Sequence, residues 1–61
     1  MNKLQQREVT KTLAYGSELG IDYIARSLSA LYRGAATSKQ QAAILEVAKQ
    51  HGATSSSEWV V

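Results

Sequence analysis

His51 is the one side chain in this sequence whose type alone suggests acid–base chemistry near neutral pH. It stands just before Gly52, at the end of a segment with helical spacing. A protonated ring would interact favourably there with the carbonyl groups of a last helical turn, so a structural role explains it. One histidine cannot hold a metal ion by itself, and the chain has no cysteine to join it. We therefore expect neither metal nor cofactor.

Other catalytic patterns are missing as well. The sequence has no glycine-rich phosphate loop and no evident pair of catalytic carboxylates, and Asp22 and Glu46 each have a cation three or four residues away. A chain of 61 residues also has little room for a pocket that excludes water. We therefore expect a protein that is not an enzyme and has no catalytic residues.

Lysine and arginine form two short rows whose charges suit the phosphates of a nucleic acid. Lys3, Arg7 and Lys11 are four residues apart, and Arg26 and Arg33 form a second row. The net charge is only +2, however, and three acidic residues, Glu8, Glu18 and Asp22, interrupt the positive field. Solvated helix faces are the simpler interpretation, with nucleic-acid contact as the alternative.

The stretch TLAYGSELGIDYIARSLSA resembles the helix-turn-helix motif of bacterial and phage regulators in its first half. Gly16 and Gly20 fit the small position and the turn, and apolar residues flank Gly20. The second half departs from the motif, because Arg26 and Ser29 stand where a recognition helix needs core residues. The resemblance implies a small DNA-binding transcriptional regulator with a degenerate helix-turn-helix, which is our alternative function.

Glycines divide the chain into three helical segments. In residues 2–19, Val9, Leu13, Gly16 and Gly20 recur at helical spacing. A glycine inside a helix is less favourable than alanine by about 1 kcal/mol. Gly16 therefore indicates either the close approach of a neighbouring helix or fraying of the first helix.

Residues 21–34 have the clearest amphipathic pattern, and Gly34 is expected to end this helix in a left-handed cap. The predicted core stripe consists of Ile21, Ile24, Ala25, Leu28, Leu31 and Tyr32. The predicted outer stripe consists of Asp22, Arg26, Ser29 and Arg33.

The third segment begins at Thr37 or Ser38, either of which can cap a helix together with a glutamine three residues later, and it ends at Gly52. The sequence thus predicts an all-α fold, a compact three-helix domain with short loops over residues 1–53. Residues 54–61 are expected to form a flexible or docking tail. The apolar residues of the third segment cover about half of its circumference, which is wider than one buried stripe. They are Ala43, Ile44, Leu45, Val47 and Ala48.

A chain this small without disulfides often relies on a partner subunit. We expect a dimer at micromolar concentration, with Leu45, Val47 or the tail at its interface. The tail carries Trp59, the only tryptophan, behind a run of serines that provides a flexible spacer. It can fold back on its own helices, cross to another subunit or dock on a different protein.

Tyrosine, tryptophan and arginine are favoured at protein interfaces. Our leading prediction is a small non-catalytic binding or regulatory protein that occupies a surface of a protein partner and forms a homodimer. Small accessory proteins of bacteria and phages have this general character. No apolar leader or bilayer-spanning stretch is visible, so we expect a cytoplasmic protein. The predicted partner-binding residues are Tyr23, Arg26, Arg33, Trp59, Val60 and Val61.

Overall fold

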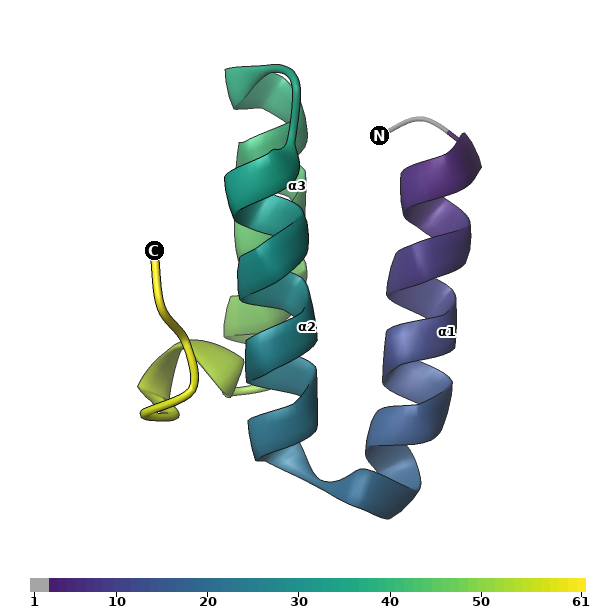
Figure 1. Ribbon diagram of the computed structural model, residues 1–61, viewed down its shortest axis with the longest axis vertical. Coiled ribbons are helices and arrows are strands. Elements are labelled where there is room, and N and C mark those ends of the chain that lie inside the picture. Colours follow the sequence, from purple (N-terminus) through teal and green to yellow (C-terminus); the bar gives the residue numbers. More distant parts are fainter. Residues whose placement is uncertain (1–2) are drawn as a thin grey trace.

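Three helices and a short turn form the computed structural model, which describes residues 3–61 (Figure 1). The helices are α1 (Lys3–Leu19), α2 (Ile21–Gly34) and α3 (Ser38–Gln50), and the turn is η1 (Ala53–Ser55). The described residues contain no strand, so the predicted all-α three-helix fold is confirmed. The predicted start of the first helix at residue 2 lies outside the described residues.

Helix α2 is the centre of the fold. Both α1 and α3 pack on it, whereas α1 and α3 have hardly any contact with each other. Figure 1 shows α1 beside α2 and α3 behind it, with residues 53–61 on the side of α2 away from α1. One flank of α1 is therefore left without a neighbouring helix. No helix within residues 3–61 has both the length and the apolar character that crossing a membrane requires.

The chain reverses direction at Gly20, so α1 and α2 run antiparallel (Figure 1). Gly20 has a φ of 98°, in a region that residues with a Cβ atom rarely adopt. This αα-hairpin differs from a helix-turn-helix unit, in which the two helices meet at roughly 90–120°. The resemblance seen around Gly20 therefore does not extend to the arrangement of the two helices.

Gly16 is the point of closest approach between α1 and α2. It is buried, and a Cβ atom added to it would lie 2.6 Å from Ile24 Cδ1 and would also overlap Ile24 Cγ1. Helix α1 continues beyond it to Leu19. Of the two explanations for this glycine, close approach is correct and fraying is not.

The loop between α2 and α3 contains a capping box. The Thr37 hydroxyl accepts a hydrogen bond from the backbone N–H of Gln40 at 3.1 Å, as predicted. The Gln40 side chain reaches back one residue further than usual, to the N–H of Ala36 at 3.2 Å. The left-handed cap expected at Gly34 is wrong: this residue still belongs to α2, and Ala35 follows in an extended conformation. The left-handed glycine is Gly52, which follows α3 with a φ of 71°.

The core lies where α1, α3 and η1 meet α2. Leu28 and Ile44 are its largest apolar side chains without solvent exposure. Two predictions for α2 are wrong. Ile21 is 41% exposed, because it begins the helix where little covers it. Ser29 is only 1% exposed. Its hydroxyl donates to the carbonyl oxygen of Arg26 at 3.1 Å, and this hydrogen bond offsets the loss of hydration on burial. The buried apolar residues are Val9, Ile24, Ala25, Leu28, Ile44, Ala48 and Ala53.

Candidate partner-binding surface

Residues 53–59 fold back onto the helices. Ala53 in η1 is fully buried, and Trp59 packs against the edge of the core. The rings of Trp59 and Tyr32 meet edge to face, with centroids 5.8 Å apart and planes inclined by 60°. This is a favourable arrangement for two aromatic rings. Of the three placements open for this segment, the structure has the one in which it docks on its own chain.

Hydrogen bonds and an ion pair also connect residues 53–59 to the outer face of α2. The Ser56 hydroxyl donates to Asp22 Oδ1 at 2.7 Å and accepts from the backbone N–H of Glu58 at 3.1 Å. Arg26 Nε donates to Glu58 Oε1 at 2.9 Å, and the Nη2 group of Arg26 bonds to the same oxygen and completes an ion pair. Four side chains thus connect α2 with a segment more than thirty residues away in the sequence.

The hydrogen bond that Arg26 donates to Glu58 raises the pKa of Arg26 above the ordinary value for arginine, and the negative charge of Glu58 raises it further. A raised pKa favours the folded state at every pH below the ordinary arginine value, and this contribution disappears only when the pH passes the raised value. Arginine therefore stays charged across the range in which proteins normally fold. The charge of Arg26 in this ion pair therefore does not change with pH in that range.

The predicted partner-binding residues lie on two segments, the outer face of α2 and the docked tail, which the ion pair between Arg26 and Glu58 connects. Arg26 and Arg33 are seven residues apart and share the outer face of α2, and the half-buried Tyr23 lies one turn before Arg26. Val60 and Val61 follow the docked tryptophan and are 56% and 67% exposed. Together with the segment that Arg26 holds, they form what we call the tail surface. Its members are Tyr23, Arg26, Arg33, Glu58, Trp59, Val60 and Val61.

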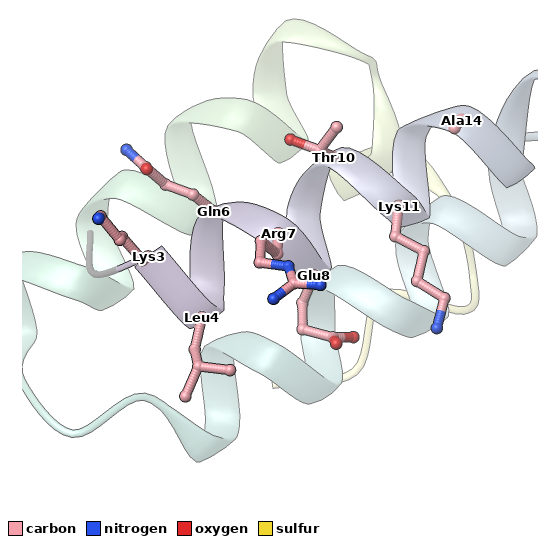
Figure 2. A pocket seen from close by; sticks show the side chains of 8 residues that line it. All are labelled: Lys3, Leu4, Gln6, Arg7, Glu8, Thr10, Lys11 and Ala14. Atoms are coloured by element: carbon pink, nitrogen blue, oxygen red, sulfur yellow. The ribbon is translucent and has the colours of Figure 1, made fainter.

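The residues predicted to contact nucleic acid do not form one patch. Lys3, Arg7 and Lys11 are exposed on α1, along a shallow hollow of about 770 Å³ that α1 alone lines (Figure 2). One helix supplies only one wall, so this hollow is open to water. Arg26 and Arg33 belong to α2, and the tail that Arg26 binds lies on the side of α2 away from α1 (Figure 1).

His51 has the structural position that its place in the sequence indicates. It is exposed and caps the end of α3, with its backbone N–H donating to the carbonyl oxygen of Val47 at 3.2 Å. Within the described part of the chain, no three His, Asp or Glu side chains gather closely enough to hold a metal ion.

Four residues that form this surface or hold it in place were not predicted from the sequence to do so: Asp22, Tyr32, Ser56 and Glu58. Tyr32 was correctly placed in the apolar stripe of α2, but nothing local to it indicated Trp59 as its neighbour. The other three meet only because the chain folds back at Gly52, and no short spacing in the sequence reports such contacts. Comparison of the chain with protein-family models, with curated proteins and with solved structures found no match.

Proposed function

We propose that this chain is a small non-catalytic protein that acts by occupying a surface of a protein partner, with the tail surface as its contact. The observation that carries this proposal is the exposure of Val60 and Val61 immediately after a tryptophan that is held in place. Apolar side chains on a disordered segment would lose conformational entropy on binding a partner, and this loss would weaken the affinity. Here the ion pair and the ring contact have already ordered the segment before them.

The charges of the tail surface support a protein partner over a nucleic acid. Arg26 is paired with Glu58, and Asp22 accepts a hydrogen bond beside them, so acidic groups lie within the contact. Phosphates would be repelled by these carboxylates. A protein surface offers both signs of charge and apolar area, which suits arginine and tyrosine next to two valines.

The alternative function is a small DNA-binding regulator, and the observation that favours it is the exposed row Lys3, Arg7 and Lys11 on α1. Binding of this kind would be electrostatic, since within residues 3–61 no recognition helix crosses α1 as a helix-turn-helix requires. Its affinity would therefore fall steeply as salt releases counterions from the phosphates. Glu8, within the same row, weakens the positive field.

The proposal is tested by affinity capture from the source cell with three folded baits. These are the parent, Val60→Glu in the tail surface, and Ala42→Glu at an exposed position of α3. Both variants add the same charge. We expect one protein to be retained by the parent and by Ala42→Glu, and its recovery to fall at least tenfold with Val60→Glu, because a buried unpaired carboxylate is strongly unfavourable.

Equal recovery of that protein by all three baits would place the contact elsewhere. A parent that retains no specific protein, but binds non-specific DNA with a steep loss between low and moderate salt, would replace the proposal by the alternative. In that case Lys11→Glu should release the DNA, whereas Arg33→Glu should have a smaller effect.

A further inference from the structure

The open flank of α1 carries four exposed side chains in a regular row. Leu4, Glu8, Lys11 and Tyr15 are separated by four, three and four residues, the spacing of a single helical stripe. Leu4 is 72% exposed and Tyr15 is 51% exposed, which is high for two large apolar side chains. Figure 2 shows Leu4, Glu8 and Lys11 on one side of α1, with Gln6 and Thr10 pointing to the other. We call this row the α1 stripe.

The spacing of the α1 stripe is the same in both directions along the helix. Its two inner residues have opposite charges, and its two outer residues are both large and largely apolar. A two-fold axis between residues 9 and 10 would relate position 4 to position 15 and position 8 to position 11. Two antiparallel copies would then place Glu8 of each chain opposite Lys11 of the other. Leu4 of each chain would face Tyr15 of the other, so apolar contacts would flank two ion pairs.

We infer that the α1 stripe is a homodimer interface in which the α1 helices of two copies pack antiparallel. Closed two-fold dimers are the commonest assemblies, and they require a self-complementary patch of this kind. A parallel arrangement would set Glu8 against Glu8 and Lys11 against Lys11, which is repulsive. The row of charges therefore selects the antiparallel orientation.

The other helices permit this approach. Helix α3 does not cover this flank, because it packs on α2. The interface differs from the one expected from sequence, since Leu45 and Val47 are partly buried, with Val47 packed against the core of their own chain.

The dimer is expected to be weak. A single pair of helices with two apolar contacts buries less surface than stable assemblies do, and contacts of that size are typically transient. We expect a dissociation constant on the order of 10–100 µM at low salt, rising with salt as the ion pairs are screened. The inference does not depend on the proposed function, because the tail surface lies on the other side of α2 and stays open in such a dimer (Figure 1).

Charge exchange tests the pairing directly. Sedimentation equilibrium is measured from 5 µM to 1 mM for the parent, for Glu8→Lys, for Lys11→Glu and for the variant that carries both changes. Each single variant sets like charges against each other in both ion pairs, so its dissociation constant should rise at least tenfold. The double variant restores opposite charges and should return to the parent value. Circular dichroism verifies that these exposed substitutions leave the fold intact.

Two further samples sharpen the result. An equimolar mixture of the two single variants should form a heterodimer. At positions 8 and 11 one chain then has two lysines and the other has two glutamates, so both pairs have opposite charges. Glu46→Lys and Lys39→Glu make the same changes in net charge at exposed positions of α3, and they should dimerise as the parent does.

A parent that remains monomeric at 1 mM would overturn the inference. A parent dimer that both single variants leave unchanged would also overturn it, and would place the interface outside the α1 stripe. Loss of the dimer with retention of partner capture would leave the proposed function standing, so the two proposals fail separately.

Discussion

Replacing Leu28 by alanine is expected to unfold a large part of the population at room temperature. Leu28 has no solvent exposure and lies in α2, on which both other helices pack. Truncating such a side chain removes its buried area and leaves a cavity, with a typical loss of about 2–5 kcal/mol. A folded chain of 61 residues has a free energy of unfolding of roughly 3–9 kcal/mol. The loss is thus comparable to the whole.

Thermal and urea melts followed by circular dichroism measure this effect. Leu19→Ala is the matched control, because it removes the same atoms from a side chain that is 62% exposed and lies outside the α1 stripe. Its melting curve should stay within about 0.5 kcal/mol of the parent, as for most surface substitutions. If Leu28→Ala melted together with Leu19→Ala, the assignment of the buried face of α2 would be wrong.

Two glycine-to-alanine substitutions are expected to change stability in opposite directions. At Gly16 the new methyl group meets the side chain of Ile24, and overpacking of a buried contact is unfavourable by about 1–3 kcal/mol. Alanine's better helix propensity offsets about 1 kcal/mol of this loss. At Gly34 nothing lies within 4 Å of the new methyl group and φ is not positive, so alanine should stabilise the protein by up to about 1 kcal/mol.

The same denaturation assay compares the two substitutions. Combining Gly16→Ala with Ile24→Ala should be less harmful than the sum of the two changes, because the second makes room for the first. Equal and favourable effects at both glycines would show that α1 and α2 are further apart than the structure has them.

The helices were predictable because local signals mark their ends. Gly20 and Gly52 adopt positive φ at two of the chain reversals, and Thr37 supplies a cap through its own side chain. Burial of small polar residues was less predictable. Thr12 is 5% exposed and Ser29 is 1% exposed, since small side chains fit between closely packed helices whatever their polarity. A pattern based on hydrophobicity assigns such residues to the surface.

The sequence suggested candidate residues for this surface but not the contacts that connect them. The choice of Arg26 and Trp59 rested on residue type, because arginine and tryptophan are favoured at interfaces. That Arg26 binds Glu58, and that Tyr32 receives Trp59, depends on contacts between residues far apart in the chain. The α1 stripe, by contrast, is visible in the sequence once the structure shows which flank of α1 is uncovered.

Residues 53–59 belong to the folded domain and hold the tail surface in place. Ordering a terminal residue is unfavourable by about 1–2 kcal/mol in backbone entropy. Burial of indole surface at about 25 cal/mol per Å² offsets that loss. The half-buried Trp59 ring should therefore stay against Tyr32.

Fluorescence of the single tryptophan measures this placement most directly. In the parent we expect blue-shifted emission and restricted quenching by iodide. Tyr32→Ala should shift the emission to the red, and deletion of residues 58–61 should lower the melting temperature. Emission like that of free indole in the parent, together with an unchanged melting curve after the deletion, would contradict the account.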